Sequence, residues 1–478
     1  MYSPTSTLSL VAMLMLILLA NKMAMGFSMT STPQRSVALK SSISKSLSMY
    51  QPLPTTTTTI STASQHDVAA ALDLKQMQEK HRPIASSFTP STFNPHPIMT
   101  NCHLQTISGV FLRKNTNCAY ITESGLGGIT KVLTALSNIH PSEEICTFWD
   151  ERQRISTPCG RDFYTVDIKY AGRRKMQFQS DQSKGMVILI HGLESNSNSS
   201  LSTDMATAYL QDGFDVTCIN FRGCCGSPND TLGGYHLGFT DDLRHFLKLM
   251  SEMWQSNANF DKRPIYLSGF SLGANVVVKC LGELGESAFS LYNVHGAAVC
   301  GAPFDAERNV KHLDAPGFNR AIYSANFLKT LKTRAQYQLD MFCNGDPETS
   351  SFDYNGVMSA TSIAEFDDAF IAKVYGFEDN LDYYRRCSCY YYLPGVAVPL
   401  FIINAEDDPF FDPAFFPIEK SVDGGNDAPI KMVRTKHGGH LGFMFHQLSE
   451  NEQMVKRPAS WMPMELARFL NYVHDKIQ

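Results

Sequence analysis

The chain has 478 residues, a formal net charge of −5 and 12 cysteines. Its hydrophobic content of 43% and charged content of 18% are typical of a globular protein with a sizeable core, and they exclude a disordered chain. The acidic balance provides no basic surface, so no nucleic-acid partner is expected. The cysteines are too few for a disulfide scaffold and lack zinc-ribbon spacing, so we interpret them as thiols in a reducing compartment.

The amino-terminal segment has the composition of a targeting sequence. Residues 8–20 are an apolar run without a charged residue, which is shorter than the ~20 residues of a membrane-spanning helix and suits a signal-peptide core. The residues that follow, to about His66, are rich in Ser and Thr and contain no Asp or Glu. We therefore predict a signal-like segment over 1–26, a transit-like segment and linker over 27–90, and delivery to a plastid through this bipartite leader. The alternative is a signal anchor that holds the protein on the endoplasmic reticulum or another internal membrane.

From about Arg152 onward, strand patterns alternate with helical patterns. Alternating or continuous apolar runs predict strands at 162–170, 186–190, 215–221, 264–269, 294–303, 398–405 and 430–435. Helical patterns lie between them at 203–211, 240–253 and 272–284. A final helix should pack against the sheet through Met464, Leu466, Phe469, Leu470 and Val473. This order predicts an α/β fold with a mostly parallel sheet flanked by helices, whose ligands bind at the carboxyl ends of the strands.

One long segment interrupts the alternation. Residues from about 306 to 393 have a helical and aromatic pattern and lie between two predicted strands. We interpret this segment as a helical cap inserted over the carboxyl edge of the sheet. The aromatic side chains would mainly form the core of the cap, and a cap this apolar suits an apolar substrate.

The pentapeptide GFSLG at residues 269–273 lies between a predicted strand and a predicted helix. A serine on such a sharp turn has its hydroxyl lifted above the sheet, and small flanking residues let the strand and helix backbones approach. Short glycine-rich motifs arise by chance, but the strand before this one and the helix after it are the context that the motif requires. We therefore predict that Ser271 is a nucleophile.

A serine nucleophile needs a base, and His440 is the candidate. It lies in the sequence KHGGHLGF at residues 436–443, after the last predicted strand, where a loop could bring its imidazole over Ser271. His437 is the competing candidate. We favour His440 because a glycine pair precedes it and an apolar residue follows it.

The base needs an orienting carboxylate. The segment NAEDDPFF at residues 404–411 ends the preceding strand and offers Glu406, Asp407 and Asp408. A plain turn would also explain the Asp-Pro pair. We favour Asp408 because it directly precedes Pro409 at the strand tip. The chain order Ser271, Asp408, His440 is the order of α/β-hydrolases and differs from the orders of the two main serine protease classes.

An oxyanion site would complete the chemistry. The strand at 186–190 runs into a loop that begins with His191 and Gly192. The backbone amide of Leu193 is predicted to act with that of Leu272 on a developing oxyanion. We interpret His191 as a residue that shapes the loop and takes no part in proton transfer.

With these residues in place, the sequence resembles α/β-hydrolases of the YheT-type branch, which includes plant embryogenesis-associated hydrolases and animal membrane-anchored α/β-hydrolase domain-containing lipases. The similarity covers nearly everything after residue 90, including FNPHPIMTNCHLQTISGVFLRK (93–114), NFRGCCGSPN (220–229), EFDDAF (365–370) and YGFEDNLDYY (375–384). It implies a hydrolase domain over 91–478 with its cap at about 306–393, and a triad of Ser271, Asp408 and His440. Residues 115–145 depart from the family as an insertion, and the leader differs from its usual single anchor.

The resemblance implies hydrolysis of carboxylic esters, often lipid esters such as acylglycerols or phospholipid acyl chains, without a metal or an organic cofactor. One alternative is an acyltransferase that uses the same triad with an alcohol acceptor. Another is a non-catalytic binding protein on a hydrolase fold, against which the intact triad argues. A phosphate-binding loop is excluded because GFSLG lacks the required Lys and glycine spacing. The acyl length, the head group and the oligomeric state do not follow from the sequence.

Overall fold

The computed structural model describes residues 65–114, 118–121, 125–137, 148–172, 183–256, 262–448 and 459–477. The apolar run at 8–20 and the Ser- and Thr-rich stretch after it lie outside the described residues, so the predicted leader stays a prediction. Within the described ranges, no helix combines the length and the apolar character needed to cross a membrane.

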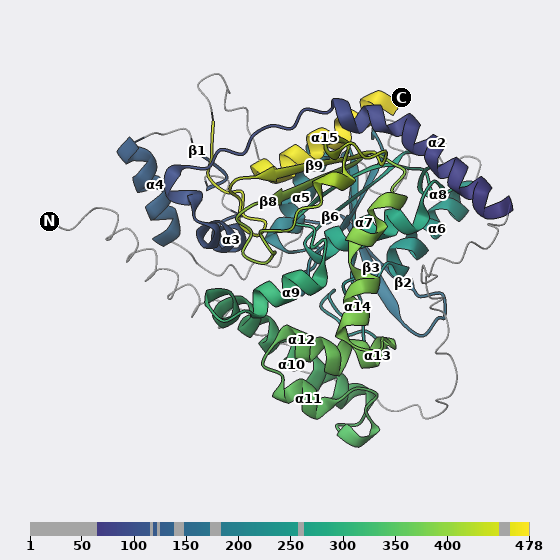
Figure 1. The fold of residues 1–478 in the computed structure, drawn as a ribbon, viewed down its shortest axis with the longest axis vertical. Coiled ribbons are helices and arrows are strands. Elements are labelled where there is room, and N and C mark those ends of the chain that lie inside the picture. Colours follow the sequence, from purple (N-terminus) through teal and green to yellow (C-terminus); the bar gives the residue numbers. More distant parts are fainter. Residues whose placement is uncertain are drawn as a thin grey trace.

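An 8-stranded sheet in the order β2-β3-β5-β4-β6-β7-β8-β9 forms the centre of the molecule (Figure 1). β2 and β3 run antiparallel to their neighbours, and all the other pairs are parallel. The predicted mostly parallel sheet is therefore confirmed. The strands are β2 (Glu151–Ser156), β3 (Phe163–Lys169), β4 (Met186–Ile190), β5 (Asp215–Asn220), β6 (Ile265–Phe270), β7 (Val294–Cys300), β8 (Leu400–Ala405) and β9 (Ile430–Thr435).

Helices cover both faces of the sheet, which explains why its central strands are continuous apolar runs. In β4, Ile188 and Ile190 belong to one apolar core, whereas Val187 and Leu189 belong to the core on the opposite face. α6 (Asp241–Ser256) and α7 (Leu272–Leu284) pack in the first core, and α5 (Ser200–Gln211) and α15 (Trp461–Ile477) pack in the second. The final helix therefore packs on the sheet as its pattern predicts. The short α8 (Ser287–Ser290), η7 (Ile418–Lys420) and η8 (Val422–Gly424) connect the larger elements.

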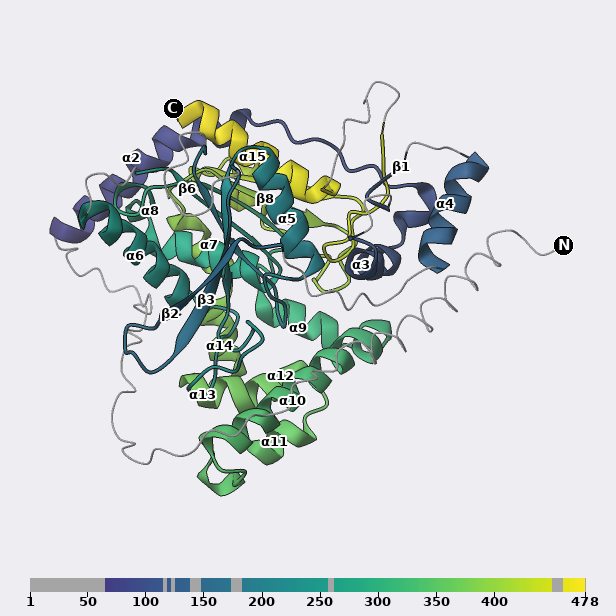
Figure 2. The same ribbon diagram turned by 180° about the vertical axis from the view of Figure 1, so that it is seen from behind.

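The segment between β7 and β8 is helical, and most of it forms a layer at one end of the molecule (Figures 1 and 2), whereas its last element returns to the core of the sheet through Cys389 and Leu393. It has its own apolar cluster, which includes Leu339, Phe352, Phe366 and Phe370. The fold thus carries the predicted helical insertion. Its elements are α9 (Ala306–Asp314), η3 (Arg320–Ser324), α10 (Ala325–Phe342), η4 (Pro347–Thr349), α11 (Tyr354–Ser359), α12 (Ile363–Phe366), η5 (Asp367–Ala372), α13 (Lys373–Tyr375), α14 (Asn380–Cys387) and η6 (Cys389–Gly395).

The amino-terminal part of the described chain differs from the predicted linker. α2 (Gln65–Ser87) is a helix that packs against the hydrolase domain, with His81 Nδ1 lying 2.8 Å from the carbonyl oxygen of Ala397. The Nε2 of Gln78 donates to the carbonyl oxygens of Pro394 and Val396 at 2.9 and 3.0 Å. The docked face is mixed, because Ala85 is fully buried and Ile84 packs against the second core beside these polar contacts. The polar residues on this face weaken the apolar periodicity by which a docked helix is identified in a sequence.

Smaller elements surround the last loop of the sheet. η1 (Pro97–Thr100) and α3 (Cys102–Phe111) precede a two-stranded sheet in which β1 (Tyr120–Ile121) pairs in parallel with β10 (His446–Gln447). α4 (Gly125–Ser137) lies within the predicted insertion at 115–145 and contributes Val132 and Leu136 to a small core with α3. This arrangement brings residues near 100 against residues near 440.

Candidate active site

Ser271 occupies the sharp turn between β6 and α7. Its backbone has φ 55° and ψ −124°, a conformation that is rare for a residue with a side chain. Its amide donates a hydrogen bond of 3.0 Å to the carbonyl oxygen of Cys300, at the end of the neighbouring strand. The hydrogen bond and the packed strands hold this strained backbone in place, as in the nucleophile elbow that the sequence motif predicts.

The glycines around Ser271 are required by close backbone approach. A Cβ atom on Gly273 would lie 2.2 Å from the carbonyl oxygen of Ile190 and 2.5 Å from that of His191. A Cβ atom on Gly269 would lie 2.6 Å from the carbonyl oxygen of Gly273. Distances this short exclude any side chain, so the spacing of the motif follows from the packing of β4 against Gly273 and of the start of α7 against Gly269.

The structure brings Ser271, His440 and Asp408 into one hydrogen-bonded chain. His440 Nε2 lies 3.0 Å from the Ser271 hydroxyl, and His440 Nδ1 lies 2.8 Å from Asp408 Oδ2. The side chains of His440 and Asp408 are 8% and 2% exposed, so little water competes for these bonds. With the proton on Nδ1 donated to the carboxylate, Nε2 is free to accept the serine proton.

The competing candidates His437, Asp407 and Glu406 are not part of this hydrogen-bonded triad. His437 Nδ1 is 3.5 Å from Asp407 Oδ2, so the two residues face each other. Asp407 also accepts a hydrogen bond of 2.9 Å from the amide of Gly439, and burial raises the pKa of its carboxyl. Glu406 is exposed. The geometry therefore separates Asp408 and His440 from the alternatives that the sequence left open.

α3 and the residues that directly follow it hold the loop that carries His440. The Thr106 hydroxyl accepts a hydrogen bond of 2.8 Å from the His440 amide, and Arg113 donates to the carbonyl oxygens of Leu441 and Gly442. Arg113 is itself buried in an ion pair of 2.8 Å with Asp204. On the other side, the Phe410 ring stacks on the imidazole, with a centroid distance of 4.0 Å.

The sequence analysis assigned no chemical role to Thr106, Arg113 or Phe410. A signal for α3 does exist in the glycines around His440. A Cβ atom on Gly439 would lie 2.4 Å from the carbonyl oxygen of Cys102. These glycines therefore mark a surface against which another backbone packs, and α3 is that backbone.

The predicted oxyanion residues flank the serine. Leu193 and Leu272 line the same cavity as Ser271. His191 lies fully buried behind them, with Nδ1 2.8 Å from the carbonyl oxygen of Gly192 and Nε2 accepting from the amide of Phe221 at 3.1 Å. Burial lowers the pKa of His191 to about 4, so the ring is neutral and both nitrogens serve the loop.

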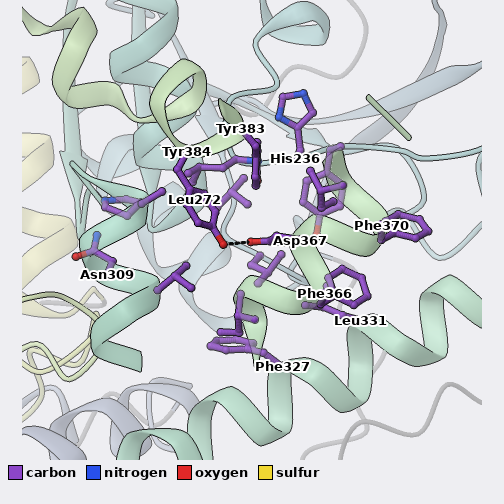
Figure 3. Close-up of a pocket in the computed structure, with 18 of the residues that line it drawn as sticks. His236, Leu272, Asn309, Phe327, Leu331, Phe366, Asp367, Phe370, Tyr383 and Tyr384 are labelled. Atoms are coloured by element: carbon purple, nitrogen blue, oxygen red, sulfur yellow. Dashed lines mark hydrogen bonds between the residues drawn. The ribbon is translucent and has the colours of Figure 1, made fainter. Parts of the chain in front are cut away.

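Ser271 is in the lining of a cavity of about 190 Å³, and Figure 3 shows side chains of the cap in the same lining. Its walls are largely apolar, as is usual for a small-molecule site. Side chains of the cap contribute most of the lining. They include Leu313, Phe327, Leu331, Phe366, Phe370, Tyr383 and Tyr384.

One arginine of the cap reaches the loop after β4, which carries the predicted oxyanion donor Leu193. Arg334 of α10 forms an ion pair of 2.9 Å with Glu194, and it donates to the carbonyl oxygen of Arg222 at 2.8 Å. Glu194 also accepts a hydrogen bond of 3.0 Å from the hydroxyl of Tyr235, whose ring lies under the Arg334 guanidinium. Because Glu194 directly follows Leu193, this contact couples the position of the cap to that of a predicted oxyanion donor. The sequence offered no signal for it.

The described part of the chain offers no set of ligands for a metal ion. No group of three or more His, Cys, Asp or Glu side chains there has the geometry to hold an ion. The cysteines among the described residues are free thiols, and most of them are buried.

Comparison with known proteins identifies the family. The family model described as "alpha/beta hydrolase fold" matches residues 185–447, more than half of the chain. The chain therefore belongs to the α/β-hydrolase fold family. It is 30% identical over 361 residues to the YheT protein of Escherichia coli (strain K12), a match that covers 75% of this chain and 89% of that protein.

Two further relatives are more distant. A monoacylglycerol lipase of Saccharomyces cerevisiae is 25% identical over 314 residues, covering 63% of this chain and 62% of the lipase. The embryogenesis-associated protein EMB8 of Picea glauca is 29% identical over 266 residues, covering 54% of this chain and 53% of that protein. The predicted YheT-type and embryogenesis-associated branch is confirmed.

Proposed function

We propose that the protein is a serine hydrolase that cleaves carboxylic esters, with lipid acyl esters as its substrates. The observation that carries this proposal is the hydrogen-bonded chain from Ser271 through His440 to Asp408, with distances of 3.0 and 2.8 Å. The apolar cavity that Ser271 lines and the naming of one relative as a monoacylglycerol lipase support an acyl substrate.

In the first half of the reaction, His440 accepts the proton of the Ser271 hydroxyl while the oxygen attacks the ester carbonyl carbon. Asp408 holds the imidazole in the required tautomer and stabilises the imidazolium that forms. The amides of Leu193 and Leu272 donate to the oxyanion. The tetrahedral intermediate collapses as His440 gives its proton to the leaving alcohol, and an acyl-enzyme remains on Ser271.

In the second half, water enters where the alcohol has left. His440 accepts a proton from this water, the hydroxide attacks the acyl carbonyl, and the bond to Ser271 Oγ breaks. His440 then returns the proton to Ser271, and the carboxylic acid departs. Each half-reaction uses one proton transfer in each direction, so no cofactor is needed.

Labelling with a fluorophosphonate tests the nucleophile directly. We expect the full-length protein to be labelled and Ser271→Ala to remain unlabelled. The matched control is Ser227→Ala, because Ser227 is an exposed serine outside the cavity lining. Folded wild-type protein that stays unlabelled and hydrolyses no ester would contradict the proposal and favour a binding protein.

The plastid destination and a membrane association also stand as proposals. They rest on the composition of residues 1–90, in which an apolar run precedes a Ser- and Thr-rich stretch without acidic residues. A fluorescent protein fused after residue 90 should accumulate in the plastid. Accumulation along the endoplasmic reticulum would instead support the signal anchor.

A further inference from the structure

The cap wall of the cavity contains a carboxyl group that the proposed triad does not use. Asp367 is the first residue of η5, and it lines the same cavity as Ser271 although it is only 8% exposed. The labelled side chains around it in Figure 3 include Phe366, Phe370 and Leu331, which are apolar. A carboxyl group in such surroundings costs free energy unless it makes hydrogen bonds.

Among the described residues, one side chain donates a hydrogen bond to the Asp367 carboxyl group. The hydroxyl of Tyr384 donates to Asp367 Oδ2 at 2.8 Å (Figure 3), and Tyr384 is itself buried. Among the described residues, neither Lys nor Arg forms an ion pair with Asp367. The other carboxyl oxygen of Asp367 is therefore available to a molecule in the cavity.

A structural role explains the neighbouring acidic residues but leaves Asp367 unexplained. Asp368 accepts a hydrogen bond of 3.3 Å from the amide of Asn380, at the start of α14. Asp314 accepts from the amides of Ile363 and Ala364, at the start of α12, at 3.1 and 3.2 Å. Asp367 makes no comparable contact with the backbone of the described chain, and it begins a π-helical turn, a feature that often marks functional sites.

The chemistry of the cavity selects the kind of ligand group. Arg334, the cation in the lining, is already paired with Glu194, so the cavity is close to neutral apart from Asp367. Burial raises the pKa of Asp367 to about 7, with a contribution from Asp314, whereas the Tyr384 hydroxyl acts in the opposite direction. A carboxyl group that is partly neutral at neutral pH is matched by an uncharged hydroxyl, which both donates and accepts hydrogen bonds.

We propose that Asp367 determines substrate specificity by accepting a hydrogen bond from a free hydroxyl group of the ester. This inference rests on the proposed ester hydrolysis at Ser271 and names the substrate class of the same site. The hydroxyl belongs either to the alcohol part of the ester or to its acyl chain. An ester with only hydrocarbon on both sides leaves the second oxygen of Asp367 without a partner, and such an ester is therefore a poorer substrate.

Two matched pairs of esters test the proposal, because in each pair a hydroxyl replaces a methyl group. The first pair is 2-hydroxyethyl octanoate and propyl octanoate, and the second is methyl 8-hydroxyoctanoate and methyl nonanoate. We expect the wild-type kcat/KM to favour the hydroxyl member of one pair by at least about 10-fold. The pair that shows the preference identifies the part of the ester that carries the hydroxyl.

Substitutions then assign the preference to the carboxyl group. In Asp367→Leu, the ratio of kcat/KM for the preferred hydroxyl ester to that for its methyl counterpart should fall by at least about 10-fold. Asp367→Asn retains a carbonyl acceptor and should retain the preference. Asp368→Asn is the matched control and should behave as the wild type. Asp367→Ala is the second variant in case the leucine does not fit the wall.

Different results would contradict the role of Asp367 and the proposed ester hydrolysis. Wild-type enzyme that hydrolyses these esters without preference in either pair would overturn the role of Asp367, as would an Asp367→Leu variant that affects both members equally. A preference for an ester that carries a trimethylammonium group over all four compounds would also overturn it, because Asp367 would then bind a cation in place of a hydroxyl. Wild-type protein that neither reacts with fluorophosphonate nor hydrolyses any ester would remove the proposed function itself, and this inference with it.

Discussion

Substitution of Arg334 by methionine tests whether the cap positions the oxyanion loop. The change removes the ion pair of 2.9 Å with Glu194, the hydrogen bond of 2.8 Å to the carbonyl oxygen of Arg222 and the guanidinium over the Tyr235 ring. Methionine keeps much of the aliphatic stem, so the cap retains its apolar contacts.

The expected magnitude follows from the burial of the pair. The side chains of Arg334 and Glu194 are 20% and 18% exposed, so the pair lies between a surface pair and a fully buried one. We expect a loss of about 2 kcal/mol in the free energy of unfolding, below the 3–5 kcal/mol that is typical when a fully buried pair is broken. Glu194 keeps its hydrogen bond of 3.0 Å from Tyr235, so the loop stays folded although it is less constrained.

The effect on catalysis should exceed the effect on substrate binding. Loss of one oxyanion donor costs about 100- to 1,000-fold in kcat, and a displaced Leu193 amide should cost part of that, about 10- to 100-fold. KM should change much less, since the apolar walls of the cavity remain. The assay measures kcat and KM on a soluble ester together with the rate of fluorophosphonate labelling.

Arg308→Met provides a matched control on the same cap. The Arg308 side chain is 51% exposed and pairs with Asp305 and Asp412 at the surface, so this variant should resemble the wild type. The reasoning would be refuted if Arg334→Met kept a kcat within about twofold of the wild-type value while its stability fell. In that case the ion pair would fasten the cap without positioning the loop.

Two further predictions concern His440 and His191. Thr106→Val removes the hydroxyl that accepts a hydrogen bond of 2.8 Å from the His440 amide, so we expect kcat to fall about 10-fold. Thr106→Ser keeps the hydroxyl and should retain activity. Equal activity of the two variants would contradict this role of Thr106. Burial lowers the pKa of His191 from 6.5 in the unfolded chain to about 4 in the folded protein. Between pH 6.5 and pH 4 the unfolded state therefore binds more protons than the folded state. For this reason the free energy of unfolding decreases as the pH falls through this interval. His191 should lower the free energy of unfolding by about 2 kcal/mol between pH 8 and pH 5. Urea unfolding of the wild type and of His191→Gln at both pH values measures this contribution. If the free energy of unfolding of the two proteins depended on pH in the same way, His191 would make no such contribution.

The sheet and the nucleophile turn could be predicted because their signals are local. Strands buried on both faces need continuous apolar residues, and 186–190 in the sequence is the range that β4 occupies. The turn at Ser271 needs glycines two residues away on each side, because other backbones come within 2.2–2.6 Å of where their Cβ atoms would lie. Such constraints act within a few residues and are therefore visible in the order of the amino acids.

The partners of these elements could not be predicted, because they come from distant parts of the chain. Thr106 contacts a residue 334 positions away, and Arg334 contacts one 140 positions away. α2, which the sequence analysis treated as linker, docks through Gln78 and His81 as well as through apolar residues, and the polar contacts weaken its periodic pattern. Each of these contacts depends on the final geometry of both partners.

By itself, the sequence determined the α/β architecture, the position of the cap and the candidate residues Ser271, Asp408 and His440. Only the tertiary structure decided which of the neighbouring carboxylates and histidines meet at Ser271, and which side chains line the cavity. The physical reason is that hydrophobic periodicity records only whether a side chain is buried. A hydrogen bond depends on distances within about 3 Å, and these are set when all the packed elements come together.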